Sequence, residues 1–281
     1  MKINKTLASL LGYLCGDGYV IKNPENQKHK YYYIGFRNTN IVLLKDFQSK
    51  FEKIFKIRPI ITKNNDRCKV QNKVLYNYLI DSFDSFYSCN WTIPNISNNS
   101  LSSWLRSYYD CDGWVACIPH KDRKIGLESI NEAGIKSIQK FLKSAFGVES
   151  SLKKRKTRKI WSLTICGRDD ILKFKKHIGF LHPAKSKKLD EAVNSYIDYK
   201  WKIPRNREGI VDFINIHGRI SNKRKEVRFN SIIKKNLTEF QHRLRSINIS
   251  SRINGPWTNP YGSIWYCLSI KKHDYDKLMR R

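Results

Sequence analysis

Two Asp-Gly pairs, each at the end of an apolar run, are the residues of this chain best suited to metal chemistry. Asp17-Gly18 and Asp112-Gly113 are separated by 95 residues. Each pair closes a helix-like run, and glycine suits the helix C-terminus because it adopts positive φ angles freely. If the two runs pack side by side as helices, the two carboxylates meet. Two carboxylates at one point are costly without a cation between them, so the sequence predicts a divalent-metal site.

Small residues recur on one face of each helix-like run. Gly12 and Gly16 are four residues apart in the first run, and Ser107 and Cys111 are four apart in the second. Small residues at this spacing let two helix backbones approach closely. We therefore expect a tightly packed helix pair whose ends carry the two acids.

The two stretches resemble the LAGLIDADG motif of homing endonucleases. The matching residues are Leu10, Gly12, Leu14, Gly16, Asp17 and Gly18 in the first copy, and Leu105, Asp110, Asp112 and Gly113 in the second. The second copy departs from the pattern at Ser107 and Cys111, which are still small. One such motif would be a weak signal, and two core helices with chance Asp-Gly ends are the alternative. Two copies followed by the same order of elements make the resemblance strong, and it covers about residues 7–198.

The resemblance implies an α+β fold of two pseudo-symmetric αββαββα half-domains, at residues 1–98 and 99–200, whose sheets form a saddle. It implies a sequence-specific endonuclease that hydrolyses double-stranded DNA at a long asymmetric site with Mg²⁺ or Mn²⁺. Asp17 and Asp112 would hold the metal, helped by the backbone carbonyls of Gly16 and Cys111. A monomer is expected because both motifs lie on one chain. Asp110, two positions before Asp112, is expected to be a cap or packing residue.

The elements expected after each motif follow one order. After the first motif we predict strands at 19–22 and 31–37, a helix at 40–57, a hairpin of 58–63 and 67–72, and a helix at 73–83. After the second motif we predict strands at 114–118 and 124–130, a helix at 132–146, a hairpin of 150–154 and 159–166, and helices at 169–178 and 185–196. Strands that pair with strands while helices lie to one side predict the α+β arrangement.

Residues 201–281 form an accessory DNA-binding region in this interpretation. The segment 210–220 aligns with both motifs without a gap, and His217 falls where the acids fall. Strands at 227–232, 250–254 and 263–270 and helices at 237–247 and 273–279 are predicted downstream. A degenerate third repeat and a winged-helix or other DNA-binding appendage are both open at this point.

A basic residue near the acids commonly assists in the family. Arg37, Lys69 and Lys73 are the candidates here, and Glu128-Ser129 corresponds roughly to Phe36-Arg37 in the second half. Side chains expected to contact DNA lie on the predicted strands and hairpin tips, where Arg, Lys, Asn and Gln can read major-groove edges or grip phosphates. These are Lys28, Lys30, Tyr31, Tyr33, Arg37, Lys63, Arg67, Lys69, Gln71, Lys121, Arg123, Lys124, Lys153, Lys154, Arg155, Lys156, Arg158 and Lys159.

Composition agrees with a polyanionic partner. The 281 residues carry a formal charge of +30, and self-repulsion on that scale is relieved when nucleic acid neutralises it. No run reaches the roughly 18 apolar residues of a membrane-spanning helix, so no membrane partner is expected. The first motif begins close to Met1, so neither a signal peptide nor an intein splicing block is predicted before it. An intron-encoded or free-standing protein is therefore favoured over an intein, and intron homing is what the resemblance implies. The seven cysteines contain no CxxC pair, so no zinc site is expected. Their odd number indicates reduced thiols in the cytoplasm or an organellar matrix.

Two other functions fit a basic saddle. One is an RNA-binding intron maturase, with intron RNA as the partner, and the other is a non-cleaving DNA-binding regulator. Loss of one motif acid would favour the regulator, whereas both Asp17 and Asp112 are present. Cleavage is therefore the leading hypothesis.

Overall fold

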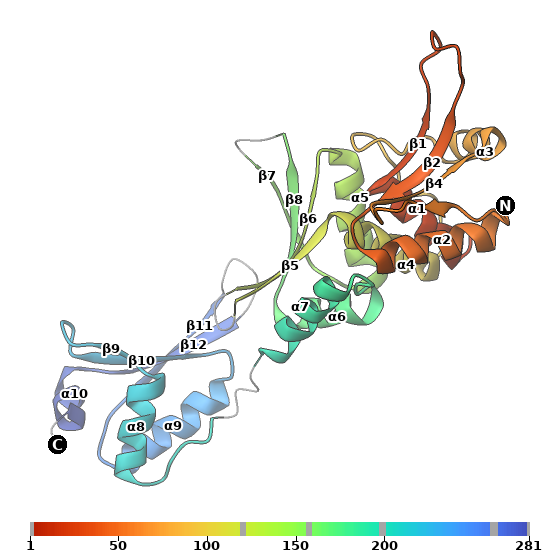
Figure 1. The fold of residues 1–281 in the computed structure, drawn as a ribbon. Helices are drawn as coiled ribbons and strands as arrows, with labels where there is room; N and C mark the ends of the chain where they lie inside the picture. The colour runs from red at the N-terminus through yellow and green to blue at the C-terminus, as the bar shows by residue number, and fades with distance from the viewer. Residues whose placement is uncertain (1–2, 119–121, 156–158, 197–200, 259–263, 280–281) are drawn as a thin grey trace. The chain divides into compact units, whose positions relative to one another are not determined.

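The computed structural model describes residues 3–118, 122–155, 159–196, 201–258 and 264–279. The chain divides into two compact units, residues 1–196 and 197–281 (Figure 1). Both combine α-helices with antiparallel sheets, which confirms the predicted α+β class. In the described part of the chain, no helix is long and apolar enough to cross a membrane.

The first unit contains two halves with one order of elements. The first half comprises α1 (Lys5–Cys15), β1 (Gly18–Lys22), β2 (Tyr32–Arg37), α2 (Ile41–Phe55), β3 (Ile60–Ile61), β4 (Arg67–Gln71) and α3 (Lys73–Phe83). The second comprises α4 (Asn98–Asp112), β5 (Gly113–Ile118), β6 (Asp122–Ser129), α5 (Glu132–Phe146), β7 (Ser151–Lys154), β8 (Trp161–Cys166) and α6 (Arg168–His177), followed by α7 (Pro183–Asn194). The predicted αββαββα pattern is confirmed in both halves.

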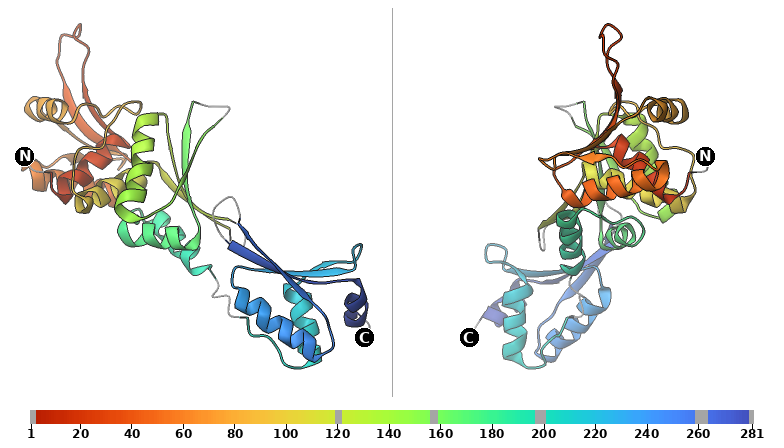
Figure 2. Two further views of the ribbon diagram at one scale, coloured as in Figure 1. Left: turned by 180° about the vertical axis from the view of Figure 1, so that it is seen from behind. Right: turned by 45° about the vertical axis from the view of Figure 1, so that its right-hand side comes forward.

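The two sheets of the first unit have equivalent topologies. Their strand orders are β1-β2-β4-β3 and β5-β6-β8-β7, and all neighbours are antiparallel. Alternate residues face opposite sides of a strand, so Ile34 and Phe36 are buried under the helices while Tyr33 and Arg37 face the open side. Helices cover one face of each sheet and leave the other uncovered (Figures 1 and 2).

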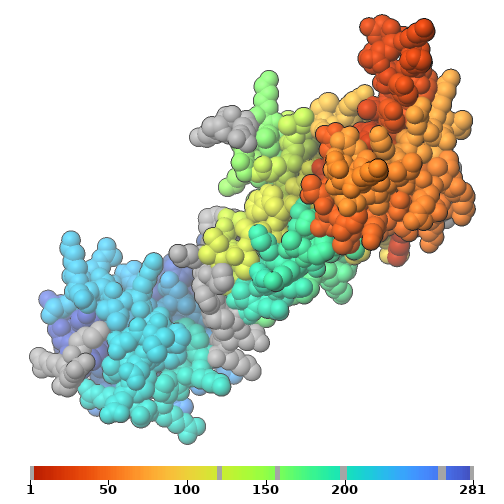
Figure 3. Space-filling model, in the orientation of Figure 1, coloured from red at the N-terminus to blue at the C-terminus, as the bar shows by residue number. Residues whose placement is uncertain are grey.

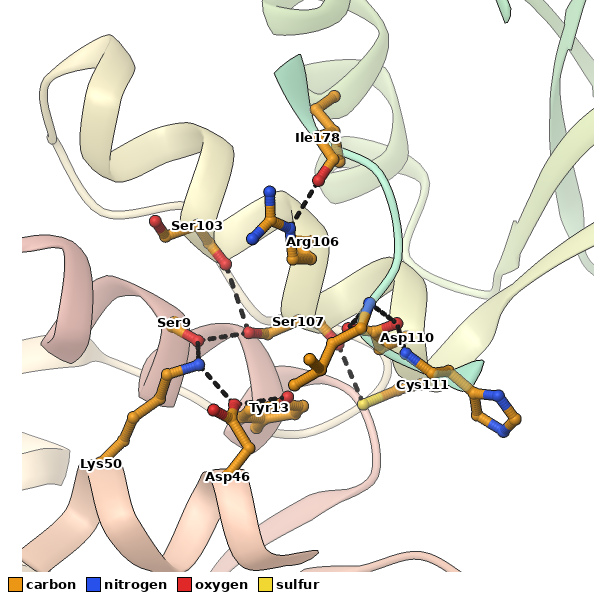
Figure 4. A network of polar contacts seen from close by, with 12 residues as sticks. Ser9, Tyr13, Asp46, Lys50, Ser103, Arg106, Ser107, Asp110, Cys111 and Ile178 are labelled. Atoms are coloured by element: carbon orange, nitrogen blue, oxygen red, sulfur yellow. Dashed lines mark hydrogen bonds and ion pairs between the residues drawn. The ribbon is translucent and has the colours of Figure 1, made fainter. Parts of the chain in front are cut away.

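Helices α1 and α4 pack closely and join the two halves into one core. A Cβ atom added at Gly12 would lie 2.3 Å from the carbonyl oxygen of Trp104, and one added at Gly16 would lie 2.6 Å from Cβ of Cys111. The Ser9 and Ser107 hydroxyl oxygens are 2.6 Å apart across this interface (Figure 4). The small residues therefore set how near the two helix ends can come.

The second unit repeats the half-domain. Its elements are α8 (Arg207–His217), β9 (Arg219–Ser221), β10 (Glu226–Ser231), α9 (Lys234–Ser246), β11 (Arg252–Thr258), β12 (Ile264–Ile270) and α10 (Lys272–Met279). The strand order β9-β10-β12-β11 is that of the other two sheets. This order of elements and strands is that of the two halves of the first unit, and we therefore call residues 201–279 the third repeat.

The observed bounds differ from the predicted ones mainly at hairpins. The short strand β9 was not predicted, and β11 runs to Thr258 although the prediction ended it at Asn254. The expected strand over 58–63 shrinks to Ile60–Ile61. Helix α7 begins at Pro183, two residues before its predicted start, because proline is tolerated in the first turn of a helix.

Candidate functional site

The C-terminal ends of α1 and α4 place the two motif acids together. Asp112 is the last residue of α4, and Asp17 lies between α1 and β1. Both acids line one pocket of about 320 Å³, which Tyr108 and Glu128 also line. Because both helices end at this point, the acids sit beside backbone carbonyls that have no partner within their own helix.

Each motif acid is held by a neighbouring side chain. Asn38 Nδ2 donates to Asp17 Oδ2 at 2.9 Å, and Tyr108 hydrogen-bonds Asp112. Burial raises the pKa of Asp17, although the bond from Asn38 acts in the opposite direction. Burial and then the charge of Asp17 raise the pKa of Asp112 to about 6. A bound cation would relieve this mutual repulsion.

Lys185, near the start of α7, supplies a cation at the end of α4. Its Nζ atom donates to the carbonyl oxygens of Tyr109, Asp110 and Cys111 at 3.2, 2.6 and 3.0 Å. Burial lowers the pKa of Lys185, whereas the nearby acids raise it. The ammonium group thus satisfies the last carbonyls of α4 and lies within electrostatic reach of Asp17 and Asp112.

The donor set at this point fits a hard divalent cation. Mg²⁺ typically takes one or two protein carboxylates and completes its shell with water and phosphate oxygens, which matches Asp17 and Asp112. Among the residues described, no group of three or more His, Cys, Asp and Glu side chains could hold a metal. The Cys111 carbonyl, one expected ligand, already accepts the bond from Lys185. The two carboxylates are therefore the main donors available.

Asp110 anchors the loop between α6 and α7. Its carboxylate, 1% exposed, accepts the backbone N–H groups of Leu181 and His182 at 3.0 and 2.9 Å. Burial raises its pKa to about 6, while these two bonds oppose the shift. Asp110 is a capping residue, and by holding this loop it fixes the start of the helix that carries Lys185.

The structure separates the three basic candidates for catalysis. Arg37 and Lys69 line a pocket of about 540 Å³ together with Asp17 and Arg67. Lys73 does not line that pocket, and its Nζ atom lies 5.6 Å from the centre of the Tyr32 ring. The sequence predicts that Glu128-Ser129 corresponds to Phe36-Arg37, and the structure shifts this correspondence by one residue.

The strand register supplies that correction. Gly18 pairs with Phe36 in the first sheet, and Gly113 pairs with Leu127 in the second. Arg37 is therefore equivalent to Glu128, and the first half has a cation where the second has an acid.

The residues expected to contact DNA fall into several groups. On the open sheet faces lie Tyr33, Arg37, Arg67, Lys69, Gln71, Lys124 and Lys153. In loops and turns lie Lys28, Lys30, Tyr31, Lys63, Arg155 and Lys159, and the loop at 23–31 projects from the first unit (Figure 3). Arg155 is paired with Glu128. Lys121, Lys156 and Arg158 lie outside the described residues.

Two of the expected DNA contacts face the helices. Arg123 donates to Ser195 Oγ at 2.6 Å and lies 4.4 Å from the centre of the Tyr196 ring. Lys154 pairs across the sheet with Trp161 and lies over its ring. Alternation along a strand sends both side chains away from the open face, so neither position supports a base contact.

Sequence reasoning missed three residues of the site. Lys185 falls in the closing stretch of the motif unit, which was identified without assigning a role to this side chain. Asn38 follows a strand by one residue, and Tyr108 lies four residues before Asp112. Only the i, i+4 spacing of Tyr108 and Asp112 is a sequence signal, because residues four apart are neighbours on a helix.

A family model described as a LAGLIDADG-like domain matches residues 4–93 and 99–179. These two matches cover more than half of the chain and coincide with the two halves of the first unit. The chain belongs to the LAGLIDADG-like family. The resemblance read from Asp17 and Asp112 is thereby confirmed, and the third repeat lies beyond the matched residues.

Curated relatives match the chain over part of their own length. The replication factor C small subunit of Thermococcus kodakarensis is 28% identical over 191 residues, covering 64% of this chain and 20% of that protein. The ATP-dependent DNA helicase Hel308 of Methanocaldococcus jannaschii is 26% identical over 221 residues, covering 66% and 16%. The chain thus spans about a fifth or less of these relatives.

Solved structures of similar fold include LAGLIDADG proteins. Mesophilic variants of the homing endonuclease I-DmoI give a TM-score of 0.49 at 19% identity, covering 66% of this chain and 97% of that one. I-DmoI in complex with DNA and Mn gives 0.48 at 18% identity, covering 62% and 96%. The N-terminal LAGLIDADG domain of DUF199/WhiA gives 0.42 at 17% identity, covering 67% and 87%.

Proposed function

We propose that this protein is a site-specific endonuclease that hydrolyses double-stranded DNA at a long asymmetric site with Mg²⁺ or Mn²⁺. The observation that carries the proposal is the shared pocket of Asp17 and Asp112 at the ends of two tightly packed helices. Membership of the LAGLIDADG-like family supports it. The net charge of +30 supports a polyanionic substrate.

The residues that line the two pockets around Asp17 would have different roles in hydrolysis. Asp17 and Asp112 would hold the divalent cation, which activates water and stabilises the leaving oxygen when bound. Asn38 orients the Asp17 carboxylate, and Tyr108 does the same for Asp112. Arg37 and Lys69 would bind the phosphate beside Asp17, because they line one pocket with it.

Both acids come from one chain, which supports action as a monomer on an asymmetric site. Intron homing and an intracellular, reducing location belong to the same proposal.

The test is metal-dependent cleavage of a DNA library that carries many long candidate sites. The wild type should give one cut site, and Asp17→Asn and Asp112→Asn should each abolish the cut while still binding the site. Asp212→Asn is the matched control, because this exposed acid lies on the equivalent helix of the third repeat. Cleavage that survives in both motif variants would contradict the proposal.

The position of Lys185 favours a second candidate function, that of a DNA-binding protein that does not cleave. Its ammonium group already lies near both acids and bonds the Cys111 carbonyl. Such a cation could balance the carboxylates without a metal. Tight DNA binding without a cut at any Mg²⁺ or Mn²⁺ concentration, in a folded wild-type protein, would support this candidate over the nuclease.

A further inference from the structure

The third repeat lacks the features that build the motif site in the first unit. Gly12 and Gly16 align with Asp212 and Ile216, and Ile216 is 74% exposed. These side chains are too large for the close helix contact made by α1 and α4. His217 stands in the place of the acid. The third repeat therefore carries no paired carboxylates, and its function must be sought elsewhere on its surface.

Helices cover one face of the sheet formed by β9–β12, which we call the third sheet. Val227, Phe229 and Leu268 face a core shared with α8, α9 and α10. Within the described residues, no helix covers the opposite face, which is uncovered in Figures 1 and 2. The side chains on this open face follow from the strand register, since directly paired residues point to the same side.

A row of arginines crosses the open face at one end. Arg219 pairs with Arg228, Arg228 pairs with Ser269, and Ser269 pairs with Arg252. Like charges directly opposite each other destabilise a sheet. Among the described residues, Glu226 forms an ion pair with Arg228 alone, at 2.8 Å. Because Arg219 and Arg252 are exposed and have no ion pair with a described residue, the row suits a row of phosphates.

Beyond the arginines lie amides and then aromatic rings. Asn230 and Asn254 each pair with Cys267. Two residues farther along β12, Trp265 pairs with Trp257, and the ring centres are 4.6 Å apart. Trp257 is 41% exposed although it is a large apolar side chain. A tryptophan pair that is partly open to solvent beside amide and guanidinium groups suits a ligand with flat faces and polar edges.

We propose that the open face of the third sheet binds unpaired nucleotides. The bases stack on Trp257 and Trp265, the Asn230 and Asn254 amides contact base edges, and the arginine row holds the phosphates. Stacking requires an exposed base face, which a duplex hides, and it is strong for single strands. From Ser269 to Trp265 the strand advances by about 13 Å, which accommodates two to three nucleotides. The surface is thus distinct from the paired-acid pocket of the first unit.

The test measures binding of the full chain to three probes without divalent metal. The probes are a 20-nucleotide DNA single strand, the same length of RNA, and the DNA duplex. Wild type should bind a single strand with quenching of tryptophan fluorescence. Trp257→Leu with Trp265→Leu should weaken single-strand binding at least tenfold and remove most of the quenching, while duplex binding changes less than threefold. Comparing the affinities for the DNA single strand and the RNA shows which nucleic acid this surface prefers.

Two further variants separate stacking from misfolding and from general charge. Trp257→Phe keeps a flat ring and should retain most of the affinity. Lys235→Gln with Arg245→Gln removes two exposed charges from helix α9 and should leave single-strand binding within twofold of wild type. Unchanged single-strand affinity in the Trp257→Leu, Trp265→Leu protein would overturn the proposal, as would an equal loss for the duplex. Loss of DNA cleavage in Asp17→Asn tests only the proposed nuclease function, so the two proposals can fail separately.

Discussion

Lys185 Nζ lies 3.0 Å from the carbonyl oxygen of Cys111, the residue just before the second motif acid. The same ammonium group binds the carbonyls of Tyr109 and Asp110. The end of α4 is therefore held by a side chain from α7, some seventy residues later in the chain. This contact couples the closing helix of the unit to the position of Asp112.

Replacement of Lys185 by methionine should destabilise the protein. Three carbonyl oxygens would lose a charged donor, although the Gly113 N–H group still binds the Tyr109 carbonyl. One buried carbonyl left without its donor costs about 1–3 kcal/mol. Denaturant unfolding of Lys185→Met should show this loss. Lys188→Met, at an exposed position on the same helix, should remain within about 0.5 kcal/mol of wild type. Equal stability of the two variants would contradict the capping role.

The proposed nuclease function also predicts a lower cleavage rate when Lys185 is replaced. The loss of its bond to the Cys111 carbonyl should displace Asp112 even where the protein is folded, because Cys111 is the residue just before this acid. Cleavage by Lys185→Met should fall at least tenfold at a temperature where circular dichroism shows native structure. Cleavage at the wild-type rate would limit Lys185 to a structural role.

Asp112 should make stability depend on pH. Burial and the charge of Asp17 raise its pKa to about 6, whereas in an unfolded chain it is near 3.9. The folded state then binds the proton more tightly, so the contribution of Asp112 is most favourable at low pH and is lost as pH rises from about 4 to 6. Asp112→Asn should therefore stabilise the metal-free protein above pH 6 by about 3 kcal/mol.

The measurement for Asp112 is the unfolding free energy at pH 4 and pH 7. The gain from Asp112→Asn should be present at pH 7 and nearly absent at pH 4. Asp81→Asn, an exposed acid on α3, serves as the control and should show no such difference. A constant effect of Asp112→Asn across this range would contradict the raised pKa.

Gly12→Ala should separate the two motif helices. The added Cβ atom would lie 2.3 Å from the carbonyl oxygen of Trp104, which is backbone and cannot rotate away. Overpacking of this kind costs about 3 kcal/mol. Thermal unfolding should report the loss, and the proposed cleavage should fall as well because the acids move apart. Asn77→Ala, on the exposed face of α3, should be nearly neutral.

Asp110→Asn should loosen the loop before α7 without removing the motif acids. Asp110 Oδ1 accepts the N–H groups of Leu181 and His182 at 3.0 and 2.9 Å, and Oδ2 also accepts from Leu181 at 3.2 Å. Asparagine would remove the negative charge and, with its oxygen in the place of Oδ1, would set an amide NH₂ donor against the Leu181 N–H group. We expect a loss of about 1–3 kcal/mol in unfolding free energy. Hydrogen exchange should quicken at Leu181 and His182 more than at Ile34 in the first sheet. Equal protection of these sites would argue against an anchoring role.

Local patterns in the sequence determined most helices of this protein and its division into repeated halves. The spacing of apolar residues predicted α5 at Glu132–Phe146 and α3 at Lys73–Phe83, with the bounds that the structure has. Repetition of the motif predicted the two αββαββα halves, and the gapless alignment at 210–220 left a third repeat open. These features follow from periodicity within one segment, which the sequence records directly.

Only the tertiary structure decided which side chains meet. Lys185, Asn38 and the two acids come from separate elements, and no local pattern records their contacts. Strand register placed Arg123 and Lys154 toward the helices and aligned Arg37 with Glu128, because a shift of one residue reverses the face of every side chain. The same register assembled Arg219, Arg228 and Arg252 into one row on the third sheet, although they are scattered along the sequence.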